Sequence, residues 1–307
     1  MIDIDELEDQ FSIEGEVGFA ELEEDLVFIT VSNIHADADI CLYGAHVTSF
    51  RPQNNIDLLW LSPESNFEVG KAIRGGIPVC FPWFGPHQSD TEMPQHGFGR
   101  LMYWDVASTA TLPGGETVIK LQLNSSEETK AFWPHDFCAE MTFVVGQKLG
   151  ISLKVTNTSS KSIEYSSALH SYFNLSLISN LTIEGLQGAK YHNQLVPGDS
   201  IQEEEKLEIS EAITRHYYDT EAPVVIVDSI YRRRIRIDKT GSKATTVWNP
   251  WEETCAQIAD LEDDAYETFV CVETVNAFED AISLVPGQSH VTSAIIGLEE
   301  LDFDNGF

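Results

Sequence analysis

The chain has 307 residues, with 50 acidic side chains against 18 basic ones and a formal net charge of −32. Apolar residues make up 42% and aromatic residues 10%, which is ordinary for a globular protein and too much for a disordered acidic chain. A negative charge of this size repels nucleic acid phosphates and anionic lipids, so we expect no nucleic acid partner and no membrane partner.

The cysteines and the N-terminal segment indicate in which cellular compartment we expect the protein. The cysteine number is odd and no pair has CxxC spacing, which argues against a disulfide framework and a zinc ribbon. The start, MIDIDELEDQ, lacks the basic and apolar regions of a secretion signal. No apolar stretch approaches the roughly 18 residues that span a bilayer. We therefore expect a cytoplasmic protein with reduced cysteines.

Alternation of apolar and polar residues dominates the chain and predicts short strands separated by turn residues. The expected strands are 118–123, 141–145, 151–157, 163–169, 224–227, 234–238, 245–248, 269–274 and 291–296. One helix is expected, at 251–259. This pattern is typical of an all-β antiparallel sandwich or barrel. No repeat or linker divides the chain, so we expect a single domain of residues 1–307, with an acidic N-terminal segment of about 1–12 loosely attached.

Residues 70–104 interrupt the strand pattern with many glycines and prolines. They carry Arg74, His96 and Arg100 among aromatic residues such as Trp83. Guanidinium groups beside aromatic rings can bind a phosphate or carboxylate while a ring stacks on a sugar. We interpret the segment as an anion-binding loop. The alternative is a structural crossover with its own aromatic core, in which the arginines form surface salt bridges.

His170 lies in a second segment of unusual composition. We expect one face of this strand to be small and polar, with Glu164, Ser166, Ala168, His170 and Tyr172. A face of this kind suits a cleft that holds a polar ligand. The alternative is a structural histidine with satisfied hydrogen bonds.

Glu273 is the single carboxylate in the otherwise apolar strand 269–276. Buried carboxylates are rare unless they are paired or functional, and desolvation raises their pKa toward the range of a general base. The alternative is a buried ion pair. Together, His170 and Glu273 would supply an acid and a base without a nucleophile or a metal.

The densest basic group is Arg232, Arg233, Arg234 and Arg236. Because the chain is so acidic, we interpret this group as a strand edge that pairs with neighbouring carboxylates, in preference to a nucleic-acid patch.

Short motifs occur in order along most of the chain. They lie at 44–52, 57–62, 72–78, 81–85, 96–100, 133–137, 169–173, 247–251 and 272–276. In this order they resemble the aldose 1-epimerase (galactose mutarotase-like) superfamily, and within it the hexose-6-phosphate mutarotase (glucose-6-phosphate 1-epimerase) branch, and the resemblance covers roughly residues 10–300. The pairing of IRGGIP with HGFGR is the part most specific to the phosphosugar branch.

The resemblance implies a large twisted antiparallel β-sandwich with a cleft on one sheet. It also implies that His170 is the general acid that protonates the ring oxygen and that Glu273 is the general base that takes the proton of the anomeric hydroxyl. The α and β anomers of a hexose 6-phosphate would then interconvert through the open aldehyde. Only protons move, so no cofactor and no metal are expected, and no obligate protein partner is evident.

Substrate binding is implied for Arg74 and Arg100, near the phosphate, with His96 and Trp83 beside them. One position departs from the family, which often has an aspartate where this chain has Thr214. The preferred hexose is therefore left open. Two other functions also stay open: a free-sugar aldose 1-epimerase and a non-catalytic sugar-phosphate-binding or regulatory protein.

Overall fold

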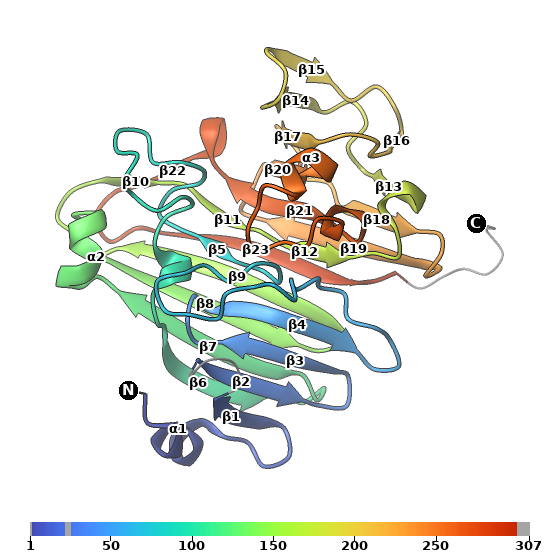
Figure 1. Ribbon diagram of the computed structural model, residues 1–307. Coiled ribbons are helices and arrows are strands. Elements are labelled where there is room, and N and C mark those ends of the chain that lie inside the picture. The colour runs from blue at the N-terminus through green and yellow to red at the C-terminus, as the bar shows by residue number, and fades with distance from the viewer. Residues whose placement is uncertain (1, 22–25, 300–307) are drawn as a thin grey trace.

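The computed structural model describes residues 2–21 and 26–299, and antiparallel sheets dominate them. Figure 1 shows a nine-stranded sheet crossing the middle of the molecule, an eight-stranded sheet above it and a four-stranded N-terminal sheet below. The expected all-β antiparallel architecture is confirmed.

The nine-stranded sheet has the order β16-β13-β18-β19-β23-β9-β8-β7-β6. Its strands are Lys206–Leu207 (β16), Leu181–Glu184 (β13), Val224–Asp228 (β18), Arg233–Thr240 (β19), Ser289–Leu298 (β23), Lys148–Asn157 (β9), Phe137–Val145 (β8), Thr117–Asn124 (β7) and Asp105–Thr111 (β6). Burial alternates strictly along β8, where Met141 lies opposite Leu153 of β9. Because the side-chain period of a strand is two, this alternation fixes the pairing register of the two strands.

The eight-stranded sheet has the order β15-β14-β17-β20-β21-β11-β5, and β12 also pairs with β21. Its strands are Asp199–Ile201 (β15), Lys190–Asn193 (β14), Ile213–Tyr217 (β17), Ala244–Asn249 (β20), Phe269–Asn276 (β21), Ser167–Leu169 (β11), Val79–Cys80 (β5) and Tyr172–Asn174 (β12). Every residue of β21 is buried. A strand covered on both faces reads as a continuous apolar run, which explains the composition of β21 and makes Glu273 exceptional.

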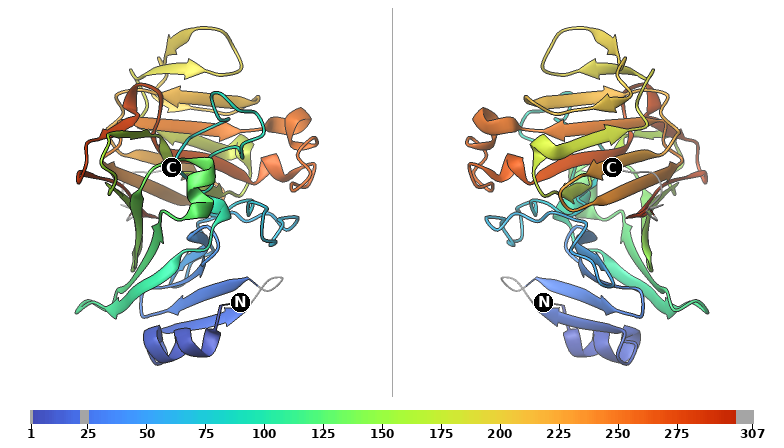
Figure 2. Two further views of the ribbon diagram at one scale, coloured as in Figure 1. Left: turned by 90° about the vertical axis from the view of Figure 1, so that its left-hand side faces the viewer. Right: turned by 90° about the vertical axis from the view of Figure 1, so that its right-hand side faces the viewer.

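The N-terminal sheet consists of Val17–Glu21 (β1), Val27–Ser32 (β2), Ala36–Cys41 (β3) and His46–Pro52 (β4). The acidic N-terminal segment is not loosely attached. Its helix, Ile4–Phe11 (α1), packs apolar side chains against the main core, and a Glu8 carboxylate oxygen accepts a hydrogen bond from the Phe19 N–H at 2.5 Å. Figure 2 shows this helix and sheet at one end of the molecule and β14 and β15 at the other.

The remaining elements are short. They are Ile163–Tyr165 (β10), which pairs with Ile282–Leu284 (β22), the helices Glu127–Phe132 (α2) and Trp251–Cys255 (α3), and the 3-10 turns Gly99–Leu101 (η1), Ile178–Asn180 (η2), Ala265–Glu267 (η3) and Phe278–Asp280 (η4). In the described parts of the chain, no helix is long and apolar enough to cross a membrane.

Each predicted strand has a counterpart in the structure, but the bounds of one predicted strand and of the predicted helix need correction. The strand expected at 163–169 is divided into β10 and β11 at Ser166, whose hydroxyl oxygen accepts the Phe84 N–H at 2.9 Å. Glu164 and His170 are therefore not on one strand. The helix expected at 251–259 ends at Cys255.

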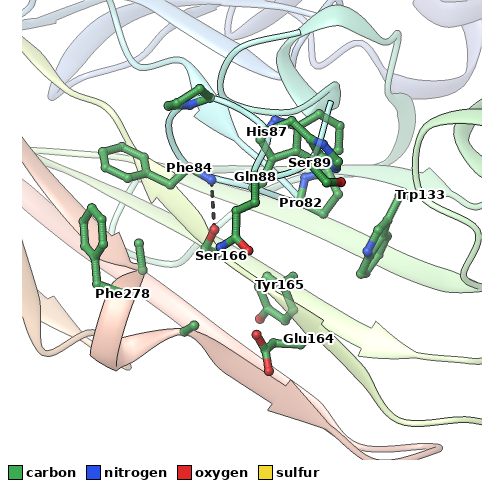
Figure 3. A pocket seen from close by; sticks show the side chains of 14 residues that line it. Pro82, Phe84, His87, Gln88, Ser89, Trp133, Glu164, Tyr165, Ser166 and Phe278 are labelled. Atoms are coloured by element: carbon green, nitrogen blue, oxygen red, sulfur yellow. Dashed lines mark hydrogen bonds between the residues drawn. The ribbon is translucent and has the colours of Figure 1, made fainter. Parts of the chain in front are cut away.

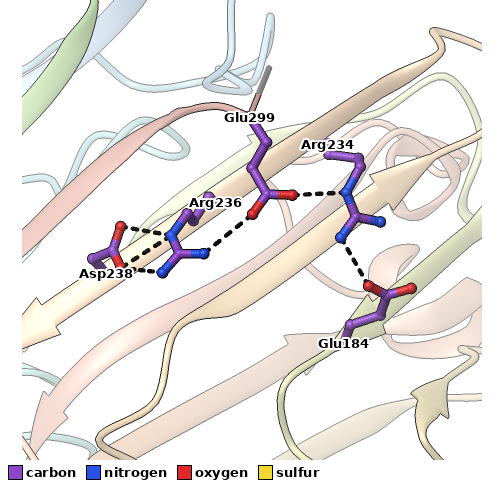
Figure 4. A network of polar contacts seen from close by, with 5 residues as sticks. All are labelled: Glu184, Arg234, Arg236, Asp238 and Glu299. Atoms are coloured by element: carbon purple, nitrogen blue, oxygen red, sulfur yellow. Dashed lines mark hydrogen bonds and ion pairs between the residues drawn. The ribbon is translucent and has the colours of Figure 1, made fainter. Parts of the chain in front are cut away.

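The arginine cluster is not a strand edge. The strand β19 is interior, between β18 and β23. The predicted pairing with carboxylates is confirmed: Arg234 contacts Glu184 and Glu299 at 2.9 and 2.7 Å, and Arg236 contacts Asp238 and Glu299 at 2.8 and 3.2 Å (Figure 4). The positive charge of these two arginines is thus compensated on the sheet surface.

Residues 70–104 have little regular structure, as predicted, and pack closely on the sheets. Gly76 has φ 60°, and a Cβ atom there would lie 2.2 Å from the carbonyl oxygen of Val47. Only glycine fits both conditions. This close approach of the Gly76 backbone to the Val47 backbone positions the loop residues that follow Gly76.

Replacing Gly76 with alanine should destabilise the protein more than the same change at Gly70. Gly70 also has positive φ, at 92°, but has open space around its Cβ position. We expect Gly70→Ala to lower the free energy of unfolding by about 1–2 kcal/mol through its backbone conformation. Gly76→Ala should cost about 1–3 kcal/mol more because of the contact with Val47. Urea unfolding of the two variants measures this difference, and equal losses would contradict the close-approach argument.

Candidate active site

His170 and Glu273 meet on one face of the eight-stranded sheet. Glu273 belongs to β21, and His170 lies in the short link between β11 and β12, where its N–H donates to the Pro78 carbonyl at 3.1 Å. The Nε2 atom of His170 is 3.4 Å from Oε1 of Glu273. The structure therefore brings together the two residues that the sequence analysis singled out separately.

Both members of this pair are buried, and burial disfavours their charged forms. Burial raises the pKa of Glu273 well above its usual value and lowers the pKa of His170 well below its own. The other polar atoms of the pair, Oε2 of Glu273 and Nδ1 of His170, are buried and have no hydrogen-bond partner in the described part of the chain. Unsatisfied buried groups of this kind are costly, and at a functional site they are available to a ligand.

Aromatic side chains surround His170. The Tyr172 ring stacks on the His170 imidazole at 4.9 Å between centroids and an interplanar angle of 15°. Trp248, from β20, approaches the same imidazole edge-on at 6.1 Å. This packing holds the imidazole plane in one orientation beside Glu273.

His96 is the second histidine of this face, and its ring centroid is 5.6 Å from that of His170. Its Nδ1 accepts the Gly85 N–H at 3.2 Å, so the neutral imidazole carries its proton on Nε2. Burial, followed by the charges of Arg100 and Arg74, lowers the pKa of His96 to about 3. His96 is thus a neutral hydrogen-bonding group next to two cations.

Arg74 and Arg100 differ in how their charges are compensated. Arg74 contacts Asp260 at 3.1 Å through Nε and donates to the Tyr172 hydroxyl at 3.1 Å through Nη1. Arg100 donates from Nη2 to the Gln95 carbonyl at 2.8 Å, while its Nε is buried without a partner. Burial lowers the pKa of Arg100, and within residues 2–21 and 26–299 no carboxylate forms an ion pair with it. Arg100 therefore has unused capacity to bind an anion.

Trp83 is placed apart from the His170–Glu273 pair. Its indole N–H donates to the Pro94 carbonyl at 2.9 Å, and its ring packs edge-on against His87 and Phe98. It lines a cavity of about 370 Å³. Figure 3 shows this cavity between the loop that carries Phe84 and the strand that carries Glu164.

The sequence analysis missed several residues of this face. They come from strands or loops far apart in the chain: His216, Thr246, Trp248 and Asp260. The available signal was the spacing: Thr214 and His216, like Thr246 and Trp248, are two positions apart and therefore share one face of their strand. Thr214 lies opposite Trp248 in the pairing of β17 with β20. Paired residues share a sheet face, so Thr214 faces the same side as the site.

The structure also shows the state of the cysteines and the positions of side chains that could bind a metal. All five cysteines are free thiols, as expected, and four of them are buried. In the described part of the chain, no three His, Cys, Asp or Glu side chains are grouped so that they could hold a metal ion.

Comparison with known proteins identifies close relatives. The sequence pattern described as aldose 1-epimerase matches residues 28–296. A Salmonella typhimurium protein named "Putative glucose-6-phosphate 1-epimerase" is 35% identical over 260 residues, which cover 83% of this chain and 84% of that protein. An Escherichia coli protein of the same name is 34% identical over 278 residues, 89% of this chain and 90% of that protein.

Solved structures agree with the sequence comparison. A crystal structure from Salmonella typhimurium, described as "a putative mutarotase", matches with a TM-score of 0.88 and 30% identity over 95% of this chain and 96% of that one. A galactose mutarotase related enzyme from Lactobacillus acidophilus has a TM-score of 0.70 at 16% identity, over 89% of this chain and 97% of that one, and shows the shared fold alone. The expected galactose mutarotase-like fold is confirmed.

Replacing Glu273 with glutamine should stabilise the protein at neutral pH. Burial raises the pKa of Glu273 in the folded state, so folding takes up a proton above about pH 4.5, where the unfolded carboxyl is ionised. The wild type therefore loses stability as the pH rises from 4.5, and a glutamine does not. We expect Glu273→Gln to raise the free energy of unfolding by about 0.5–2 kcal/mol at pH 8, with a smaller gain at pH 5.5.

Urea unfolding at the two pH values measures this gain, with Glu164→Gln as the control because the Glu164 side chain is exposed. A gain that does not depend on pH, or that is equal in the control, would contradict the assigned pKa direction.

Proposed function

The chain belongs to the aldose 1-epimerase family and is an isomerase, and we propose that its substrate is a hexose 6-phosphate whose α and β anomers it interconverts. The observation that carries the phosphate specificity is Arg100, a half-buried guanidinium whose buried Nε has no hydrogen-bond partner and which has no acidic partner among the described residues. The names of the relatives from Salmonella typhimurium and Escherichia coli support the same substrate.

The phosphate binds to Arg100 and Arg74. A guanidinium pairs with phosphate oxygens through directed, charge-assisted hydrogen bonds, which are stronger than neutral ones. Arg74 is already oriented by Asp260 and Tyr172, and it adds charge without needing to be reoriented. The Nε2 of His96, which carries the proton, lies 3.2 Å from the Gln95 side-chain amide, and it donates to the substrate near these cations by exchanging that contact.

Proton transfer is assigned to the His170–Glu273 pair. The Glu273 carboxylate takes the proton of the anomeric hydroxyl, the C1–O1 bond becomes a carbonyl, and the C1–O5 bond breaks. The protonated His170 imidazole gives its proton to O5. The open aldehyde rotates about C1–C2, and the reverse transfers close the ring on the other face of the carbonyl.

The reactive form of the pair carries its one proton on His170, and ring opening converts this form into the uncharged one. After the transfer Glu273 is a neutral acid and His170 a neutral imidazole, which are the forms that burial favours at both residues. The pair holds one proton before and after the step, so no proton has to come from solvent. Each positioned transfer contributes roughly 10²–10⁴-fold to the rate.

A free-sugar aldose 1-epimerase is the second candidate. It is favoured by the contacts of Arg74, whose guanidinium already has an acidic partner in Asp260 and needs no phosphate. The two candidates differ in whether removal of the phosphate leaves the rate unchanged.

Exchange NMR on equilibrated glucose 6-phosphate and on glucose separates these functions. We expect the protein to accelerate α/β exchange of the phosphate ester far more than that of the free sugar. Glu273→Gln, which keeps the shape of the side chain but removes the base, should lower the acceleration by about 10²–10⁴-fold. Equal acceleration of both sugars would establish the free-sugar enzyme, and binding without acceleration would establish a non-catalytic sugar-phosphate-binding protein.

Arg100→Met should raise KM for glucose 6-phosphate and leave the exchange of glucose, where it is measurable, unchanged. The variant keeps most of the side-chain length and removes the charge. Loss of a charge-assisted hydrogen bond of about 1.5–3 kcal/mol corresponds to a rise in KM of about 10- to 150-fold.

Arg51→Met is the matched control, because Arg51 is exposed and paired with Asp37 on the N-terminal sheet. If Arg100→Met changed the kinetics of both sugars by the same factor, Arg100 would be structural and the phosphate assignment would be wrong.

A further inference from the structure

His216, Thr246 and Glu273 form a row across three neighbouring strands. In the strand pairing, His216 of β17 lies opposite Thr246 of β20, and Thr246 lies opposite Glu273 of β21. Directly opposite residues of an antiparallel pair point to the same face of the sheet. The row therefore extends from the proposed base away from β11 and β12, and so away from His170.

His216 has one nitrogen engaged and one without a partner. Its Nδ1 is 2.8 Å from the Thr246 hydroxyl oxygen. No hydrogen bond within residues 2–21 and 26–299 involves its Nε2. The residue is buried, and burial lowers its pKa to about 4, so the imidazole is neutral at pH 7. Whichever tautomer is present, Nε2 can exchange one hydrogen bond with a hydroxyl group, which both donates and accepts.

Two phenylalanines hold the His216 ring. The Phe278 centroid is 4.7 Å away, and Phe84 contacts the ring edge-on at 5.9 Å. Phe84 also contacts His96 at 5.1 Å, so His96 and His216 contact the same aromatic ring. These contacts fix the orientation of the His216 imidazole in the same way that Tyr172 fixes that of His170.

The order of atoms in a pyranose determines what would lie next to His216. C1 is bonded to the ring oxygen O5 on one side and to C2 on the other. With O5 at His170 and the C1 hydroxyl at Glu273, C2 extends away from His170. C6 is attached next to O5, so its phosphate lies on the opposite side, toward Arg74 and Arg100.

Strand spacing agrees with this placement. Neighbouring strands are about 4.8 Å apart, so two strand steps place the His216 backbone about 10 Å from that of Glu273. This separation is comparable to the width of a hexopyranose ring with its hydroxyl groups. Thr246, on the strand between them, has a short side chain and is bonded to His216.

We propose that His216 contacts the C2 hydroxyl of the sugar and thereby determines which C2 configuration the protein prefers. The inference rests on the proposed function, because the positions of O5 and the C1 hydroxyl come from the roles assigned to His170 and Glu273. It assigns His216 a role in substrate selection and none in proton transfer.

Asparagine and glutamine at position 216 separate the two nitrogens of the histidine. His216→Asn keeps a polar group near the place of Nδ1, where Thr246 binds, and loses the group near Nε2. His216→Gln keeps a polar group near Nε2. The substrates are glucose 6-phosphate, its C2 epimer mannose 6-phosphate, and 2-deoxyglucose 6-phosphate, which lacks the C2 hydroxyl. Exchange NMR gives kcat/KM for each.

We expect His216→Asn to lower the ratio of kcat/KM for glucose 6-phosphate over 2-deoxyglucose 6-phosphate about 5- to 10-fold relative to the wild type, the value of one hydrogen bond. His216→Gln should restore most of this ratio. The preference between glucose 6-phosphate and mannose 6-phosphate should shrink with it in the asparagine variant. A merely structural role would lower kcat/KM for all three substrates by the same factor and leave the ratios unchanged.

His192→Asn is the matched control. His192 lies in the same row, opposite His216 but one strand further from Glu273, and its side chain is 40% exposed and bound to Asp199. It should leave all ratios unchanged. An unchanged ratio in His216→Asn, or an equal change in His192→Asn, overturns the inference.

The wild-type measurements test the proposed function separately. If the wild type accelerates only free hexoses, the phosphate assignment fails, and the ratio for glucose over 2-deoxyglucose then decides the role of His216 in the same way. If the wild type accelerates none of the sugars, the proposed function fails and the inference fails with it.

Discussion

The burial of one carboxylate is the constraint on which the rest of the site depends. Glu273 occupies the middle of β21, a strand whose eight residues are all buried. A charge in this place is unfavourable, so the surroundings favour the neutral acid, and the His170 imidazole lies 3.4 Å from it. In the proposed reaction the two residues exchange a single proton through a substrate while the total charge of the pair stays constant. The proposed function thus rests on a carboxylate in a core position.

The positively charged arginines near this pair contrast with the negative net charge of the whole chain. A net charge of −32 repels an anionic substrate at long range. The proposed binding of a phosphate therefore requires short contacts in a partly desolvated place, where electrostatic interactions are stronger than in water. Arg100 is the proposed place, because its charge has no acidic partner among the described residues. The arginines of β19 do not, because Glu184, Asp238 and Glu299 already compensate Arg234 and Arg236.

Strand patterns were predictable where one face of a strand is buried and the other is not. The alternation along β8 and β9 identified both strands, and the carboxylate of Glu273 was conspicuous in an apolar strand. The position of a strand within its sheet was less predictable. An arginine-rich strand with polar residues on its outer face has the same sequence pattern at a sheet edge and in the sheet interior. The prediction that the N-terminal segment is loosely attached was wrong because it relied on the acidic composition and gave no weight to the apolar side chains that pack on the core. Which of the strand-borne histidines lies near the site depends on which strands are neighbours in the sheet, and local sequence does not specify the neighbours.

The sequence by itself determined the all-β architecture, the irregular loop of residues 70–104, and the residue types that could move protons and bind an anion. These properties follow from local composition and from the two-residue period of a strand. Tertiary structure alone decided that His170 contacts Glu273, that Arg100 lacks an acidic partner while Arg74 has one, and that His216 shares a row with the proposed base. The reason is physical: these relations join strands far apart in the chain, and the pairing of strands across a sheet is set by the packing of the whole core.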